Sequence, residues 1–225
     1  MKVKVTKEGP YEVTGKVPLK TVKIEADEHG TSVEWVVDET FNVPEEYHLC
    51  RCGHSKNKPF CDASHTKVDF DGEETANNIP YLEGAKKYEG SSVSLLDNEQ
   101  YCVVARFCDR GIGVWDAAIN SDDPDNAKLA TEEACDCPSG RLVIVDKEGN
   151  MVEPNFDKEI YLIEDTPKKH LGSIWVRGGI QVEGADGKKY EMRNRITLCR
   201  CGESSNMPFC DATHLDCPHM AIKKD

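Results

Sequence analysis

Two stretches of the chain alternate apolar and other residues with a period of two. They are GPYEVTGKVPL (9–19) and GSIWVRGGIQV (172–182). This alternation is typical of half-buried β-strands, and the glycines inside each stretch mark a bend. The stretches align at five positions: Gly9 with Gly172, Tyr11 with Ile174, Val13 with Val176, Gly15 with Gly178, and Val17 with Ile180. The sequence therefore predicts the same strand unit twice.

A second strand-like run and a cysteine-rich loop follow each of these stretches. The runs are VEWVVDETF (33–41) and YEMRNRITL (190–198), and the loops are CRCGHSKNKPFCDASH (50–65) and CRCGESSNMPFCDATH (199–214). The repeated unit is thus strand, strand and loop, and we expect a short helix after Pro59 and after Pro208.

The segment between the two copies has a different pattern. NSDDPDNAK (120–128) predicts a loop, and RLVIVDKEGNMV (141–152) predicts a hairpin. We expect three small modules, at residues 1–70, 71–152 and 153–225. Because strands dominate and helices are few, the predicted fold class is α+β and mainly β.

Composition limits the partners and the location. Asp and Glu outnumber Lys and Arg by 41 to 28, so the net charge is −13. Binding to nucleic acid needs clustered positive charge, so we expect no such partner. No segment resembles a signal peptide or a membrane span, so we expect no membrane partner and a cytoplasmic location. In a reducing compartment, the 11 cysteines indicate metal ligands or catalytic groups.

Both cysteine-rich loops have the spacing C-x-C-x8-C-x3-H. Three thiolates and one imidazole fit tetrahedral zinc, and they also fit an iron–sulfur cluster. The C-x-C spacing differs from that of the common zinc knuckle, which favours a cluster over two structural zinc fingers. The candidate ligands are Cys50, Cys52, Cys61 and His65 in the first loop, and Cys199, Cys201, Cys210 and His214 in the second.

The two loops resemble the CDGSH iron–sulfur family, whose pattern is C-x-C-x2-[ST]-x3-P-x-C-D-G-[SAT]-H. The positions that match beyond the ligands are Ser55, Pro59 and Asp62, and Ser204, Pro208 and Asp211. Ala63 and Ala212 stand where the pattern has glycine, which costs some strain if the turn there is tight. We expect Asp62 and Asp211 to cap the loops or support the ligands rather than to act as catalytic acids.

The resemblance implies a 2Fe–2S cluster in each loop. Cys50 and Cys52 would hold the inner iron, and Cys61 with His65 the outer iron, as would their counterparts in the second loop. Protons compete for both histidines, so we expect the clusters to be lost or retuned as the pH falls. Family members with one motif form homodimers with exchanged strands. The tandem motifs therefore resemble that dimer in one chain, packed on a pseudo-twofold axis; two independent modules are the alternative.

The central segment resembles divergent mono-cluster ferredoxin-like domains in the run CPSGRL (137–142). Val104 and Arg106 stand where the earlier motif of those domains has His and Gly. The resemblance implies a third cluster, 4Fe–4S or 3Fe–4S, in a small α+β insertion. A zinc site, or a disulfide between the first two cysteines, is the alternative. The candidate ligands are Cys102, Cys108 and Cys137, with Cys135 as the candidate fourth.

One cysteine is left over, and signatures of enzymes are missing. We expect Cys217 to be a buried or free thiol, and a further metal site with His214 and His219 is the alternative. The sequence has no phosphate-binding loop, G-x-S-x-G or H-E-x-x-H motif, so we do not expect an enzyme.

The expected function is electron transfer by a cluster-binding protein. Cluster storage or transfer, or redox and pH sensing, is a second hypothesis, and a structural zinc-binding interaction protein is a third. The expected partner is a redox protein or a cluster acceptor. We expect the chain to act as a monomer with an internal pseudo-twofold axis.

Overall fold

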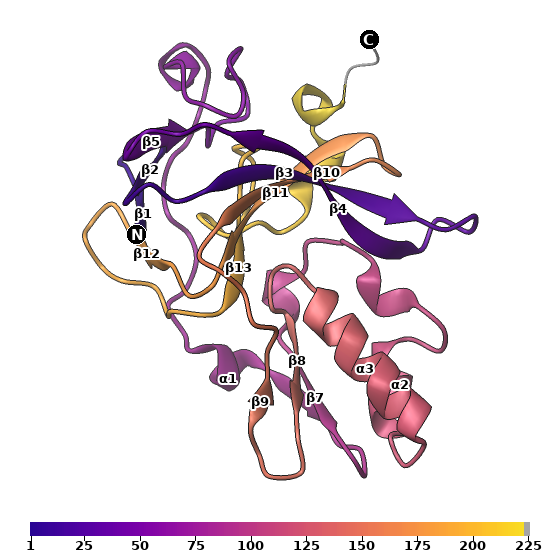
Figure 1. Cartoon of the computed structure of the whole chain (residues 1–225). Helices are drawn as coiled ribbons and strands as arrows, with labels where there is room; N and C mark the ends of the chain where they lie inside the picture. The colour runs from indigo at the N-terminus through magenta and orange to yellow at the C-terminus, as the bar shows by residue number, and fades with distance from the viewer. Residues whose placement is uncertain (223–225) are drawn as a thin grey trace.

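The computed structural model describes residues 1–222, and most of its regular structure is β-strand (Figure 1). We call residues 1–70 the first half, residues 71–152 the central segment and residues from 153 onward the second half. Within these residues three sheets form, two from the halves and one from the central segment. The predicted α+β, mainly β class is confirmed.

The two halves exchange strands. One sheet has the order β12 (Gln181–Glu183), β1 (Lys2–Val5), β2 (Tyr11–Thr14) and β5 (Glu46–Leu49). The other has the order β13 (Arg195–Leu198), β11 (His170–Arg177), β10 (Ile160–Asp165), β3 (Leu19–Ala26) and β4 (Ser32–Phe41). The second half thus gives β12 to the sheet of the first half, and the first half gives β3 and β4 to the sheet of the second.

Equivalent strands pair in the same register in both sheets. β2 and β5 are antiparallel, as are β11 and β13, and each exchanged strand, β12 or β3, pairs in parallel with its host sheet. The matching pairs are Val13 with Tyr47 and Val176 with Ile196, and Val3 with Val182 and Ile160 with Leu19. The predicted pseudo-dimer is therefore confirmed, and its apolar core is shared by both halves.

Two predicted strands differ in detail. β4 covers the run 33–41 at one edge of its sheet, and its Val33, Val36 and Val37 are exposed. In the run 190–198, only Arg195–Leu198 is a strand. The period-two pattern located both strands, but it did not show that they form the two edges of one sheet.

The central segment packs helices against its own small sheet. The sheet has the order β6 (Lys86–Tyr88), β7 (Ser94–Asp97), β8 (Leu142–Val145) and β9 (Met151–Val152), so the predicted hairpin at 141–152 forms. The α-helices are α1 (Tyr81–Gly84), α2 (Val114–Ile119) and α3 (Pro124–Asp136), and short 3₁₀ turns lie at Glu99–Tyr101 and Phe107–Asp109. None of the helices within residues 1–222 is long and apolar enough to cross a membrane.

The predicted loop at 120–128 is wrong in its second part, because α3 begins at Pro124. The Asp123 carboxylate accepts a hydrogen bond from the Asp125 amide and caps the helix. Proline suits the first turn, where an amide proton has no partner within the helix. The same residues that are typical of a loop therefore start a helix here.

Candidate metal centres

The two cysteine-rich loops, 50–65 (the first loop) and 199–214 (the second loop), share one set of local hydrogen bonds. The hydroxyl of Ser55 donates to the Phe60 carbonyl at 2.6 Å, and that of Ser204 donates to the Phe209 carbonyl at the same distance. The first cysteine amide of each loop donates to the proline carbonyl at 2.8 Å, Cys50 to Pro59 and Cys199 to Pro208. Each loop is therefore closed by its own residues.

The aspartates that follow the third cysteines cap the loops, as predicted. Asp62 accepts hydrogen bonds from the amides of Lys56 and Ser64, and Asp211 accepts from those of Ser205 and Thr213. The bonds from Ser64 and Lys56 hold the pKa of the Asp62 carboxyl well below its usual range. A carboxylate that stays ionised and bonded within its loop has a supporting role and not one in proton transfer.

The alanines that replace the glycine of the pattern adopt the conformation that favours glycine. Ala63 has φ 65° and Ala212 has φ 72°, both in the left-handed region. A 3₁₀ turn follows each alanine, at Ser64–Lys67 and Thr213–Asp216, where we expected a helix to begin soon after the proline. Both loops thus keep the tight turn and accept the strain of a Cβ there.

The four candidate ligands of each loop form two close pairs. In the first loop, the sulfurs of Cys50 and Cys52 lie 3.8 Å apart, and Cys61 Sγ lies 3.5 Å from His65 Nδ1. The corresponding distances in the second loop are 3.4 Å between Cys199 and Cys201 and 3.3 Å between Cys210 and His214 Nδ1. With metal bonds of about 2.3 Å to sulfur and 2.0–2.1 Å to nitrogen, two ligands of one tetrahedral ion lie about 3.6–3.8 Å apart. Each pair therefore fits one metal ion.

The two pairs of a loop do not converge on one point. Within residues 1–222, the only three candidate ligand atoms that all lie within 4.8 Å of one another belong to Glu12, Glu46 and His48, outside both loops. The ligands of a single tetrahedral ion would all lie within about 3.8 Å of one another. Each loop thus presents two separate ligand pairs, which fit a group with two metal ions better than one zinc ion.

In each loop, the pair formed by the two cysteines of the C-x-C segment (the inner pair) stabilises one thiolate. The hydrogen bond from Cys52 lowers the pKa of the Cys50 thiol to about 6, and the same contact raises the pKa of Cys52. In the second loop, Cys201 lowers the pKa of Cys199 to about 7, while its own pKa rises. Because metals bind the thiolate, this arrangement favours ligation.

The pairs formed by the third cysteine and the histidine of each loop (the outer pairs) differ in burial. Cys61 and His65 are partly exposed, whereas Cys210 and His214 are only 2% and 4% exposed. Burial, with a further contribution from the charge of Arg200, lowers the pKa of His214 to about 4. His214 is therefore neutral near pH 7, which is the form of imidazole that binds metals.

Sequence reasoning missed two buried arginines, Arg51 and Arg200, which separate the first two cysteines of each loop. The Arg51 Nε donates to the Gly9 carbonyl at 2.8 Å, and the Arg200 Nε donates to the Gly172 carbonyl at 2.6 Å. Each arginine thus ties its loop to the strand unit of its own half. The repeated C-R-C triplet could have pointed to these arginines, because a positive charge beside cysteine thiolates offsets their negative charge.

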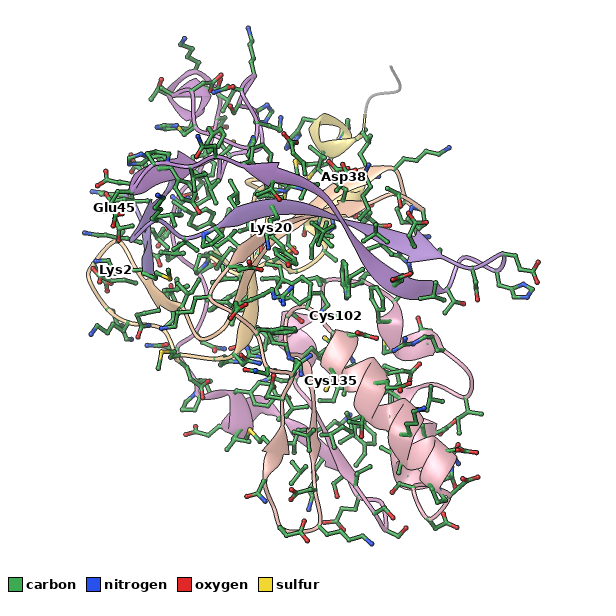
Figure 2. All side chains as sticks on the ribbon, viewed as in Figure 1. Lys2, Lys20, Asp38, Glu45, Cys102 and Cys135 are labelled. Atoms are coloured by element: carbon green, nitrogen blue, oxygen red, sulfur yellow. The ribbon has the colours of Figure 1, made fainter. Side chains whose placement is uncertain are left out.

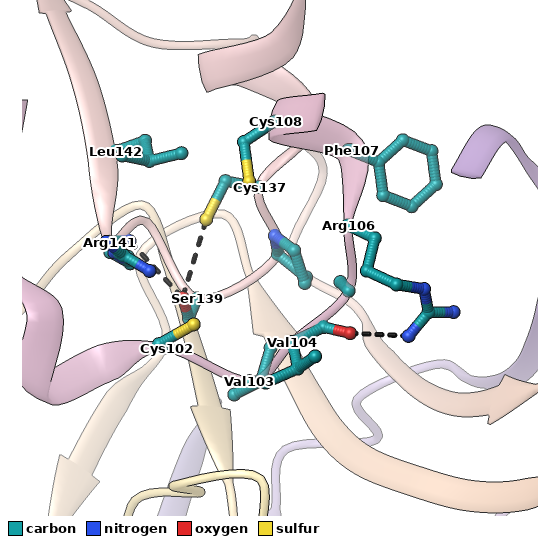
Figure 3. Close-up of a pocket in the computed structure, with 12 residues that line it drawn as sticks. Cys102, Val103, Val104, Arg106, Phe107, Cys108, Cys137, Ser139, Arg141 and Leu142 are labelled. Carbon is teal, nitrogen blue, oxygen red and sulfur yellow. Dashed lines mark hydrogen bonds between the residues drawn. The ribbon is translucent and has the colours of Figure 1, made fainter. Parts of the chain in front are cut away.

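The central cysteines Cys102, Cys108 and Cys137 line one cavity, together with Ser139 and Arg141 (Figure 3). Cys137 is buried and its sulfur lies 3.5 Å from the Ser139 hydroxyl, while the other two cysteines are partly buried. Burial raises the pKa of the Cys108 thiol to about 12. The three thiols line one cavity but, within residues 1–222, do not form a triplet close enough to bind a single ion together.

Cys135, the candidate fourth ligand, does not line this cavity. It lies on the last turn of α3, where its carbonyl accepts a hydrogen bond from Arg195 of β13 at 2.9 Å (Figure 2). Arg195 also bonds the Cys137 carbonyl at 2.7 Å, so it holds the end of α3 beside the cavity. Three of the four predicted central cysteines are thus brought together, and the fourth is set apart.

One of the two departures from the ferredoxin-like motif, Arg106, has a structural explanation. Arg106 stands at a position where glycine is usual and keeps the left-handed conformation, with φ 64°; Val104 has φ 53°. The Arg106 guanidinium forms a bidentate ion pair with Asp165 of β10, at 2.7 and 2.9 Å. This ion pair anchors the cysteine-bearing loop to the second half, and it offsets the strain that glycine would avoid.

Cys217 is buried, as predicted. Its sulfur donates to the Thr213 carbonyl at 3.4 Å, and its side chain packs in the small apolar cluster that also contains Cys199 and Cys201. His219 does not join it in a metal site: its Nε2 lies 2.9 Å from the Cys201 carbonyl oxygen.

Two family models match the chain. The model described as iron-binding zinc finger, CDGSH type, matches residues 8–66 and 171–215, and the model described as divergent 4Fe-4S mono-cluster matches residues 88–147. No curated protein and no solved structure matches the chain. The matched segments contain every candidate ligand in the loops and all four cysteines of the central segment, so the resemblance noted in the sequence is confirmed.

Proposed function

Because the chain is an iron–sulfur cluster-binding protein with two CDGSH-type segments around a divergent 4Fe-4S mono-cluster segment, we propose that it transfers electrons. Each loop would hold a 2Fe–2S cluster, and the central cavity would hold a third cluster, 4Fe–4S or 3Fe–4S. Bound clusters of these kinds supply one-electron oxidation and reduction. The proposed role is that of a carrier and not of an enzyme.

The separation of each loop into two ligand pairs carries this proposal. Cys50 and Cys52 would bind one iron, and Cys61 with His65 the other, as would Cys199 and Cys201, and Cys210 with His214, in the second loop. Each pair has the spacing of two ligands on one tetrahedral ion. The wider separation between pairs supports two irons over one zinc ion.

The partner would be a redox protein that approaches the first loop. Cys61 and His65 lie partly exposed there, whereas the equivalent residues of the second loop are buried. With a net charge of −13, the chain favours a partner with a basic docking face. We propose that one chain acts alone, because its strand exchange already supplies the second motif that a one-motif relative would take from another subunit.

Iron and sulfide analysis of the anaerobically purified protein tests the proposal, together with EPR of the reduced protein. About four irons per chain would correspond to the paired loops, and about seven or eight would add the central cluster. Reversible reduction with no loss of iron is the expected result. Stoichiometric zinc with no sulfide would contradict it.

Cluster donation from the first loop is a second candidate, and the partial exposure of its outer ligand pair favours it. Incubation of the loaded protein with an apo-ferredoxin would then lead to cluster transfer, measured by visible circular dichroism. The Cys210→Ala variant, which keeps the first loop intact, should still donate a cluster. The Cys61→Ala variant should not, and equal transfer from both variants would contradict this role.

A further inference from the structure

The second loop contacts the first loop backbone to backbone. A Cβ placed on Gly53 would lie 2.7 Å from the Cys201 carbonyl oxygen, and one on Gly202 would lie 2.8 Å from that of Cys52. Both glycines have positive φ, 77° and 88°. Only glycine therefore allows the two C-x-C segments to approach this closely, and the contact is reciprocal across the pseudo-twofold axis.

A pair of stacked histidines reinforces this contact. His54 of the first loop stacks on His219, with ring centroids 4.2 Å apart, and His219 Nε2 lies 2.9 Å from the Cys201 carbonyl oxygen. Figure 1 shows the loop of the first half and the C-terminal turns at the same end of the molecule. The inner ligands of the two loops are thus neighbours.

Another part of the second loop contacts the residues beside the central site. The Asn206 side-chain amide donates to the Gln100 carbonyl at 3.1 Å, and the rings of Tyr101 and Phe209 meet edge to face at 5.4 Å between centroids. Tyr101 directly precedes the candidate ligand Cys102, and Phe209 directly precedes Cys210. One ligand of each site therefore lies one residue away from this aromatic contact.

We propose that these two contacts hold the three ligand sets in a row, with the second loop in the middle as the relay between the first loop and the central cavity. The inference rests on the proposed function, because it needs all three sites to carry clusters. The buried second loop suits a middle position, and the partly exposed Cys61 and Cys108 suit the two ends. An electron that moves one step along the row oxidises the site it leaves and reduces its neighbour, so the exchange itself needs no further reactant.

EPR of the fully reduced protein tests the order, with one site removed at a time. Cys61→Ala removes the first-loop cluster, Cys210→Ala the second and Cys108→Ala the central one. Two neighbouring paramagnetic clusters broaden each other's signals and relax faster than isolated ones. We expect this broadening and faster relaxation in Cys61→Ala and Cys108→Ala, because two neighbouring clusters remain in each. We expect neither effect in Cys210→Ala, where the first loop and the central cavity have no cluster between them.

The opposite pattern would overturn the proposal. If the two ends interact as strongly in Cys210→Ala as neighbours do in the other variants, the second loop is not the middle site. If no pair interacts in the fully loaded protein, the row does not exist. Iron and sulfide content is measured on the same samples. A missing cluster would count against the proposed function, whereas clusters that are present but do not interact would count against the row alone.

Glycine variants test the contact without removing a ligand. Gly53→Ala and Gly202→Ala push the two C-x-C segments apart, so the interaction between the loop clusters should weaken at unchanged iron content. Gly187→Ala is the matched control, since Gly187 also has positive φ, 85°, but no atom lies within 4 Å of its added Cβ. An unchanged interaction in both loop variants would show that this contact does not position the clusters.

Discussion

The first and second loops have the same local structure, but their surroundings differ. The first loop packs Phe60 against Phe41 and Tyr47 of its own half and leaves its outer ligands partly exposed. The second loop packs Phe209 between Tyr101 and Tyr190. The strand exchange treats both loops alike, but the central segment reaches the first loop through the hydrogen bond from Arg51 to the Gly72 carbonyl, whereas Thr75, Gln100 and Tyr101 all contact the second loop. An insertion between two equivalent motifs has therefore made one site a surface site and the other an interior site.

Substitution of Arg51 or Arg200 tests the buried contact that both loops share. Of the changes proposed here, we expect these to have the largest effect. Arg51→Met and Arg200→Met each leave buried carbonyl oxygens without a donor, at a cost of about 1–3 kcal/mol per group. The loss in free energy of unfolding should therefore be about 3 kcal/mol in each variant, measured by denaturation of the loaded protein. A large loss in one variant alone would show that the two arginines have different roles.

Removal of metal tests how the loops differ. A chelator should strip the first loop several-fold faster than the second, because Cys61 and His65 are partly exposed whereas Cys210 and His214 are buried. The rates are measured by visible absorbance in Cys210→Ala, which leaves the first loop, and in Cys61→Ala, which leaves the second. Equal rates would mean that burial of Cys210 and His214 does not protect their metal.

A substitution that loosens the contact of Thr75 with the second loop should reduce the difference in the rate of metal removal between the two loops. The Thr75 hydroxyl donates to the Ser205 carbonyl at 2.8 Å and accepts from the Met207 amide at 2.9 Å. Thr75→Val removes both hydrogen bonds, at a cost of about 1 kcal/mol each. Chelation of the second loop should become several-fold faster, while the first loop keeps its rate as an internal control.

The smallest effect is expected where alanine replaces the glycine of the family pattern. Ala63→Gly and Ala212→Gly relieve left-handed strain of about 1–2 kcal/mol. They also add flexibility to the unfolded chain, which costs about 0.4–1 kcal/mol. Each variant should gain roughly 0.5 kcal/mol in thermal denaturation. A loss in either loop would mean that the alanine methyl group makes a contact worth more than the strain.

The local parts of the fold and site could be predicted from the sequence, because they depend on neighbours along the chain. The repeat gave the strands, their bends and the ligand spacing, and the cap by Asp62 depends on residues no more than six positions away. The start of α3 was misjudged because Asp-Pro is equally typical of a turn and of a helix N-terminus.

The burial of the second loop could not be predicted, because distant residues cause it. Thr75 lies 132 positions from Met207, and Gln100 lies 106 positions from Asn206. The position of Cys135 also depends on a distant residue, Arg195, which bonds its carbonyl from β13. No pattern of hydrophobic positions records such contacts, so two nearly identical loops gave identical expectations.

The exchange of β3 and β12 has a consequence for how the protein is made. A nascent chain that has emerged only as far as the first loop cannot complete either sheet, because β3 pairs with β10 and β1 pairs with β12, and both partners are translated later. Parallel pairings over such long sequence separations form slowly. The open edges of β1 and β3 are meanwhile free to pair with other chains. A complete sheet around the first loop therefore depends on translation as far as β12.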